Sequence, residues 1–295
     1  MHQLLIRRSG FTLTELIVAM TIFAVLGALF TRALLTQGRI ADQQNAARSS
    51  RMAARQGMNI LESELRMVQD SGGIEVAAAD GKSIRVLVPY RSGLNCGVAG
   101  GKTVVSMLPV DSLSLAQARY AGFAWRNQVS RYTTVTPGDP TGVDAPVSSV
   151  NAAQCTGAGA GQAQIRTLTL NTRSGAVLDV SPAQATAPKG QPVFFYQRVT
   201  YTFAASTLFP GRIGLFRAVQ GGSSEEIMAP FDTLARFKYW TQSAAASVAA
   251  PPALALIRGV DVVFSAQSNY TPMGKTTPTR TTVVASIFFR NTRAF

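Results

Sequence analysis

The chain has 295 residues, of which 46% are hydrophobic and only 15% are charged, and its formal net charge is +13. This composition excludes a disordered or collagen-like chain and is sufficient for a sizeable buried core. The positive charge is compatible with a polyanionic partner, but the basic residues are scattered and form no five-residue block. A nucleic-acid partner is therefore an open alternative without specific support.

The N-terminal region combines a short cationic start with a long apolar run. Arg7 and Arg8 precede Gly10, and between Phe11 and Thr31 the only ionisable residue is Glu15. This run is about as long as an α-helix that crosses a bilayer. The arginines on its N-terminal side favour a cytoplasmic start and place the rest of the chain on the other side of the membrane.

Small residues precede the apolar run instead of following it, unlike in an ordinary secretory signal. Cleavage between Gly10 and Phe11 would leave the apolar helix at the N-terminus of the mature chain, with a cationic amine on Phe11. Glu15 lies about one helical turn further along. Pairing of its carboxylate with this amine, or with that of an adjacent helix, would lower the cost of burying both charges and fix the register of neighbouring helices.

This arrangement resembles the class III signal of type IV prepilins and type II secretion pseudopilins: a basic leader followed by Gly10, Phe11, Thr12, Leu13, Thr14 and Glu15. The resemblance extends from Arg7 to about Phe30. It implies cleavage after Gly10 by prepilin peptidase, methylation of the Phe11 amine, and a role for Glu15 as the assembly carboxylate. The alternative is a plain signal anchor with an incidental glutamate.

A continuous helix is expected from Phe11 to about Gln69, because good helix formers dominate its outer part and no proline interrupts it. One face of this outer part is apolar and should pack under a sheet of the same chain. That face consists of Met58, Leu61, Leu65 and Val68. Gly72 and Gly73 are expected to end the helix. Many major pilins carry a proline near the end of the apolar half; here bending would have to come from Gly27, Gly38 or Gly57.

The rest of the chain alternates strand-like runs with turns, which predicts a β-rich head. The expected strands are Ile84–Val88, Val104–Val110, Ile165–Leu170, Val193–Phe203, Arg212–Val219, Leu234–Trp240, Val260–Ala266 and Thr281–Arg290. The turn at Pro210 and Gly211 predicts that two of these, Val193–Phe203 and Arg212–Val219, form a hairpin. The predicted class is α+β and pilin-like, with a long N-terminal helix packed on a large antiparallel sheet.

The predicted organisation has four parts. They are a leader peptide at residues 1–10, a transmembrane or filament-core helix half at 11–31, an amphipathic helix half at 32–71, and a β-rich head at 72–295. Loop insertions rich in small residues and proline are expected in the head near residues 137–161 and 244–252.

Two cysteines, Cys96 and Cys155, would lie outside the cytoplasm, where a disulfide is expected. In the chain-entropy model, closing the loop between them would stabilise the head by about 4 kcal/mol. The alternative is two separately buried thiols.

No enzymatic activity, cofactor or metal is expected. The single histidine, His2, belongs to the leader, so the mature chain would lack a histidine for nucleophilic catalysis or zinc binding. The stretch Gly97–Thr103 resembles a phosphate-binding loop but has one residue too few between its glycines. Asp139 and Asp144 are a calcium alternative, although their loop lacks the alternating acids of a calcium site.

These observations predict a structural minor pilin that takes part in the initiation or the tip of a type IV pilus, which serves adhesion, motility or DNA uptake. The head is weakly similar to minor pilins of the PilW kind and to the J-type pseudopilin. A J-type pseudopilin of a type II secretion tip complex is the alternative, and a surface adhesin or DNA-binding receptor with a basic head is a further one. Expected partners are prepilin peptidase and other minor and major pilins or pseudopilins, contacted through the N-terminal helix. The expected location is the bacterial inner membrane, with a cytoplasmic leader and a periplasmic head, and later the pilus or pseudopilus.

Overall fold

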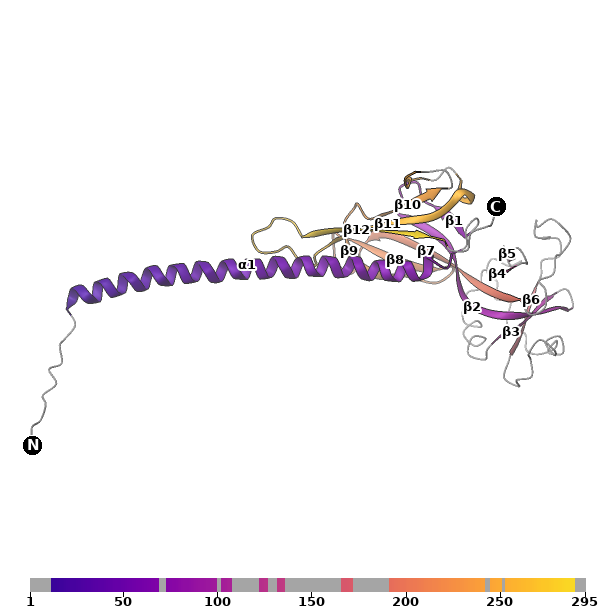
Figure 1. The fold of residues 1–295 in the computed structure, drawn as a ribbon, viewed down its shortest axis with the longest axis horizontal. Helices are drawn as coiled ribbons and strands as arrows, with labels where there is room; N and C mark the ends of the chain where they lie inside the picture. The colour runs from indigo at the N-terminus through magenta and orange to yellow at the C-terminus, as the bar shows by residue number, and fades with distance from the viewer. Residues whose placement is uncertain are drawn as a thin grey trace, which may run out of the picture.

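The computed structural model describes residues 12–68, 73–99, 102–107, 122–126, 132–135, 166–171, 191–241, 245–250 and 253–289. One long helix projects from a β-rich head, and its C-terminal part lies against the sheet (Figure 1). The predicted α+β class, with a long helix packed on a large antiparallel sheet, is confirmed.

The helix α1 spans Leu13–Leu65 without interruption, through all three glycines that were expected to allow bending. It ends four residues earlier than predicted, with Arg66 as its C-cap. The backbone N–H groups of Met67 and Val68 then bond to carbonyls three residues back, at 3.2 and 3.1 Å. This tighter turn brings Val68 into the core, where it is fully buried. Gly72 lies outside the described residues.

The described part of the head forms one antiparallel sheet. Its strands are β1 (Ile74–Ala77), β2 (Ser83–Ala99), β3 (Lys102–Met107), β4 (Gly122–Arg126), β5 (Tyr132–Val135), β6 (Arg166–Asn171), β7 (Pro192–Ala205), β8 (Ile213–Val219), β9 (Ser224–Phe231), β10 (Arg236–Thr241), β11 (Ile257–Gln267) and β12 (Arg280–Phe288), with a short 3-10 helix, η2 (Leu254–Leu256). The main order is β10-β11-β9-β8-β7-β2-β3-β6; β1 pairs with β2, β12 with β11, and β4 with β5 and β7.

All eight predicted strands overlap observed ones, and β7 and β8 form the predicted hairpin. The predicted end of the first strand at Pro89 is wrong, because β2 continues through it to Ala99. A shift in register between Pro89 and Arg91 accommodates the proline without breaking the pairing with β7. Four strands, β1, β4, β5 and β9, were not predicted. In the case of β9, its polar start at Ser224 and its internal Pro230 hide the strand pattern.

The structure describes part of one predicted loop insertion and none of the other. Residues 137–161 lie outside the described residues. Within 244–252, Val248 bonds to Tyr239 of β10 through both backbone groups, at 2.7 and 2.9 Å. This part of the insertion is therefore held against the sheet.

The core lies between the C-terminal part of α1 and the sheet. The helix buries small residues first and then Leu61 and Leu65. Facing it is an aromatic cluster, Phe203, Phe231, Phe237 and Phe264, whose neighbouring ring centroids lie 5.1 to 6.4 Å apart. A Cβ atom on Gly57 would lie only 3.0 Å from Cε1 of Phe264. The absence of a side chain at this position is what lets the helix approach the aromatic rings so closely.

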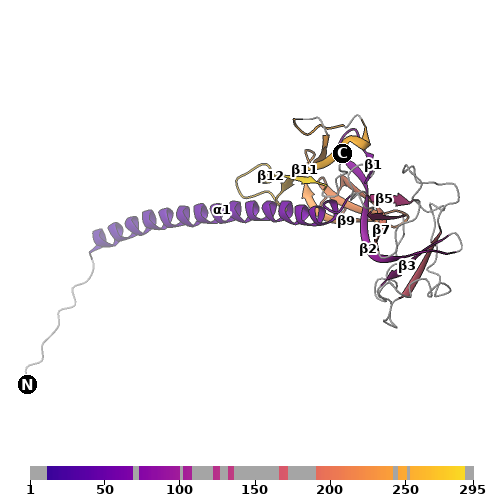
Figure 2. The same ribbon diagram turned by 45° about the vertical axis from the view of Figure 1, so that its right-hand side comes forward.

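The head has a near and a far part relative to α1. Strands β9, β11 and β12 contact the helix. The distal half of β2 leads to β3, which lies beyond the C-terminal end of α1 in both Figure 1 and Figure 2. The N-terminal half of the helix therefore projects from one end of the molecule, opposite the distal strands.

Candidate assembly site on the N-terminal helix

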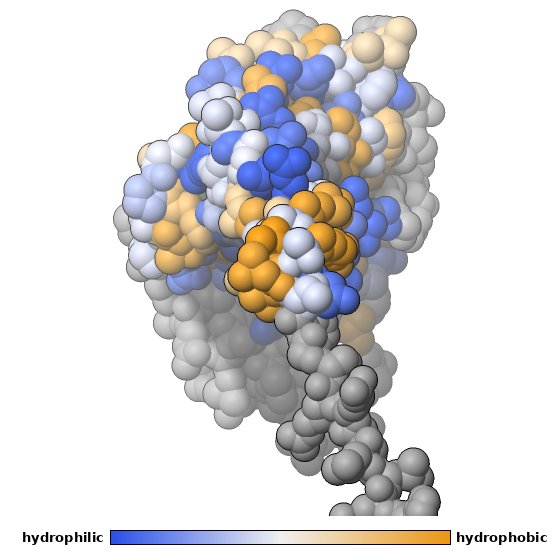
Figure 3. All heavy atoms as spheres, turned by 90° about the vertical axis from the view of Figure 1, so that its left-hand side faces the viewer, coloured by the Kyte–Doolittle hydropathy of each residue, from blue (hydrophilic) through white to orange (hydrophobic). Residues whose placement is uncertain are grey.

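The N-terminal half of α1 has an apolar surface that nothing in the described chain covers. Every residue from Thr12 to Ala41 is exposed, including Phe23 and Phe30. Viewed from its N-terminal end, this half is largely hydrophobic, whereas the neighbouring head surface carries many hydrophilic residues (Figure 3). Among the described helices, only α1 is long and apolar enough to cross a membrane. Such a surface requires lipid or other apolar helices around it.

Glu15 is the only acidic residue between Thr12 and Ala41, and it takes part in capping the N-terminus of α1. Its Oε2 accepts hydrogen bonds from the Thr12 N–H at 3.0 Å and the Thr12 hydroxyl at 2.9 Å. The Glu15 N–H in turn donates to the Thr12 hydroxyl at 3.4 Å. This is a capping box, so the carboxylate lies at the positive end of the helix dipole.

The sequence contains the signal for this capping box, because a threonine three residues before a glutamate at the start of an apolar run is its usual pattern. The capping box was not among the predictions, which paired Glu15 with the Phe11 amine of its own chain or with that of an adjacent helix. Gly10 and Phe11 lie outside the described residues. Cleavage after Gly10, methylation of Phe11 and pairing with its amine therefore stay predictions.

The capping box still leaves the carboxylate available to a partner. Glu15 is exposed in the isolated chain, and every other side chain from Thr12 to Thr31 is neutral. When lipid or helices cover this segment, an ionised carboxylate needs a cationic partner to offset its desolvation. The amine of an adjacent helix is a partner of the right charge.

Polar contacts between distant parts of the chain hold the outer half of α1 on the head. Near its end, Glu64 accepts hydrogen bonds from the Tyr201 hydroxyl and from Nε of Arg217, the latter at 3.2 Å. Further towards the N-terminus, the hydroxyls of Ser50 and Thr281 lie 2.7 Å apart. The outer half of α1 is therefore bonded to the sheet both near its end and at Ser50.

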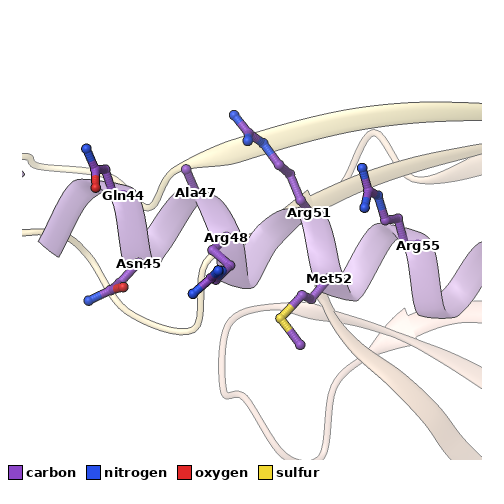
Figure 4. Close-up of a pocket in the computed structure, with 7 residues that line it drawn as sticks. All are labelled: Gln44, Asn45, Ala47, Arg48, Arg51, Met52 and Arg55. Atoms are coloured by element: carbon purple, nitrogen blue, oxygen red, sulfur yellow. The ribbon is translucent and has the colours of Figure 1, made fainter. Parts of the chain in front are cut away.

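A shallow hollow lies on the exposed side of α1, level with the head. It is lined by Gln44, Asn45, Ala47, Arg48, Arg51, Met52 and Arg55. Arg51 and Arg55 point to one side of the helix, and Arg48 and Met52 to the other (Figure 4). Among the described residues, none of these arginines forms an ion pair with an acid. The hollow therefore presents three cationic side chains to whatever packs there.

The other candidate sites are only partly described. Cys155, Asp139 and Asp144 lie outside the described residues, so the disulfide and the calcium alternative are untested. The described residues of the glycine-rich stretch, 97–99 and 102–103, lie in the paired strands β2 and β3, with Val98 opposite Thr103. A phosphate-binding loop would instead join a strand to a helix.

Comparison with known proteins identifies the N-terminal segment. A family model described as the prokaryotic N-terminal methylation motif matches residues 5–31. The type IV prepilin-like class III signal predicted from the sequence is confirmed by this match. The motif supports a type IV pilin-like or pseudopilin precursor and implies processing by prepilin peptidase and assembly with other pilins. No curated protein and no solved structure matches the chain.

Proposed function

We propose that this chain is a minor pilin of the PilW kind, a structural subunit that helps to initiate a type IV pilus or stands at its tip. The observation that carries this proposal is the prepilin-like signal at residues 5–31, joined to an exposed apolar half-helix and a β-rich head. The half-helix is the part that enters the helical bundle, and the head is presented on its outside. The proposed role is structural and includes no catalysis.

The arginines on the exposed side of α1 support a subunit present in few copies. In a bundle of parallel helices with the heads outside, the helix face turned away from the head meets neighbouring helices. Identical neighbours would bring Arg48, Arg51 and Arg55 near the same residues of other copies, and opposing like charges is unfavourable where water is scarce. A different subunit with carboxylates on its helix is the better neighbour.

The proposal places the precursor in the bacterial inner membrane, with the leader in the cytoplasm and the head in the periplasm. N-terminal sequencing and intact mass measurement of the protein from membranes test this pathway. A mature chain that starts at a methylated Phe11 is the expected result. A chain that retains Met1, or one cut after Phe30, would contradict it.

A J-type pseudopilin of a type II secretion system shares the same signal and helix, and is the alternative. Deleting the gene separates the two. Loss of surface pili with normal secretion supports the minor pilin, and loss of secretion with normal piliation supports the pseudopilin.

A further candidate function is a DNA-binding receptor or adhesin, which is favoured by the basic surface of the hollow around Arg48, Arg51 and Arg55. Binding of DNA by the full chain in nanodiscs, measured across salt concentrations, tests it. No binding at low salt would exclude the DNA receptor.

A further inference from the structure

The connection between β11 and β12, residues 268–279, forms an arm that lies along α1. The Ser49 hydroxyl lies 3.2 Å from Oδ1 of Asn269 near the base of the arm. Further out, the Tyr270 hydroxyl donates to the Asp42 carbonyl at 3.1 Å, and the Met273 N–H donates to the Asp42 carboxylate at 2.6 Å. The arm therefore extends towards the N-terminal half of the helix, as Figure 1 shows beside α1.

Hydrogen bonds also hold the arm in shape. At its base, Ser268 and Thr279 bond through the Ser268 N–H at 2.8 Å and the Ser268 hydroxyl at 3.0 Å. At its tip, the Lys275 N–H donates to the Pro272 carbonyl at 3.0 Å, and Gly274 adopts a φ of 80° that this tight turn requires. The tip is thus a defined turn in a fixed place beside the helix.

The tip combines cationic and apolar groups. Met273 is 55% exposed, and Lys275 is also exposed. A Cβ atom on Gly274 would lie 4.0 Å from Nε of Arg39, so the tip touches this arginine of α1. Among the described residues, neither Arg39 nor Lys275 forms an ion pair with an acid. The nearby Asp42 carboxylate is turned to the Met273 N–H.

The length of the apolar half of α1 determines where the tip would lie relative to a bilayer around that half. Exposed apolar side chains continue past Arg32 to Leu34 and Leu35. A helix from Leu13 to Leu35 is about 34 Å long, which spans a hydrocarbon core of about 30 Å with a moderate tilt. The long side chain of Arg32 can reach the interface from within this segment. Arg39 lies about 6 Å beyond Leu35, within a headgroup layer of about 5 to 7 Å.

We propose that the arm is a membrane-surface contact: Arg39 and Lys275 bind phosphate groups of anionic phospholipids, and Met273 inserts among the headgroups, while the chain is anchored in the bilayer before assembly. Charge complementarity favours this occupant, because the tip carries two cations and the headgroups carry phosphates. The contact would hold the head at one height and orientation above the membrane. The inference rests on the membrane anchoring that is part of the proposed function, and it does not depend on which machine the subunit serves.

Photo-crosslinking of the full chain in nanodiscs tests the contact. Benzoylphenylalanine replaces Met273 at the tip, Phe23 in the apolar half as a positive control, or Val76 on β1 as a negative control. Val76 is 42% exposed, and it follows the far end of α1, about 40 Å along the helix from Arg39. Each variant is irradiated in nanodiscs of phosphatidylcholine alone and with phosphatidylglycerol. The crosslinked species are identified by mass spectrometry.

The expected result is lipid crosslinking at Met273 and Phe23 but not at Val76, with the Met273 yield raised by phosphatidylglycerol. Replacing both cations, Arg39→Gln with Lys275→Gln, should lower the Met273 yield at least about fivefold and leave the Phe23 yield unchanged. The contact is refuted if Met273 does not crosslink lipid while Phe23 does. It is also refuted if the Met273 yield changes neither with the anionic lipid nor with the two substitutions. Crosslinks from Met273 to protein alone would refute the lipid contact and identify a neighbouring subunit as the partner of the tip. Absence of lipid crosslinks at Phe23 would overturn membrane anchoring itself, and with it the proposed function.

Discussion

Replacing Leu61 by alanine should show how strongly α1 is docked on the head. Leu61 is fully buried in the core between the helix and the sheet. The substitution removes three carbons, worth about 2.4 kcal/mol of transfer free energy. The surrounding core, of which the aromatic cluster is part, relaxes only partially around such a space. A cavity term therefore adds to the transfer term, and we expect a loss of about 3 to 4 kcal/mol in the free energy of unfolding.

Urea unfolding of the full chain in detergent, followed by near-UV circular dichroism, measures this loss. Leu26→Ala is the matched control, because Leu26 is 56% exposed in the apolar half and should change the free energy of unfolding by less than about 0.5 kcal/mol. Leu61→Met keeps the volume and should cost less than about 1.5 kcal/mol, which provides a folded variant if the alanine protein does not accumulate. A loss below about 1 kcal/mol for Leu61→Ala would refute the docking of α1 on the sheet.

Three further predictions concern polar groups. Glu15→Gln keeps an acceptor for the Thr12 N–H but removes the charge, so we expect normal cleavage and failed assembly. Thr12→Val keeps the charge and should assemble. Immunoblots of the mature chain and of sheared filaments measure cleavage and assembly, and normal assembly of Glu15→Gln would contradict the charge-pairing role. Glu64→Gln should lower the free energy of unfolding by about 1 to 3 kcal/mol, because the hydroxyl of the buried Tyr201 loses its charged acceptor. In a double-mutant cycle, additivity with Tyr201→Phe would argue against a coupling between Glu64 and Tyr201. Burial raises the pKa of Glu226, but hydrogen bonds from the turn at residues 206–208 lower the pKa by more, to a value below the ordinary 4.5. Because the folded pKa is depressed, the stabilisation is complete above about pH 4.5 and is lost as the pH falls below it. The protection factor of the amides in the turn between β7 and β8, which is corrected for the intrinsic pH dependence of exchange, should therefore fall on acidification. An identical pH dependence in Glu226→Gln would exclude this cause.

Features that depend on neighbours along the chain could be predicted from the sequence. The class III signal is a linear pattern around Gly10, Phe11 and Glu15, and the helix follows from an uninterrupted run of good helix formers. The β7–β8 hairpin was predicted for the same reason, because Pro210 and Gly211 mark a turn between two strand-like runs. The capping box of Thr12 and Glu15 was equally local and was visible in the sequence.

The prepilin-like signal, the apolar half-helix and the α+β class could all be predicted from the sequence alone. The end of α1 and the polar start of β9 became clear only in the folded chain. The same holds for the contact of Glu64 with Tyr201 and for the reach of the arm at residues 268–279 to Asp42. These features depend on residues that are distant along the chain. Periodicity and turn chemistry act between near neighbours, whereas Glu64 and Tyr201, or Asp42 and Met273, are far apart in sequence and meet only after the sheet has packed on the helix.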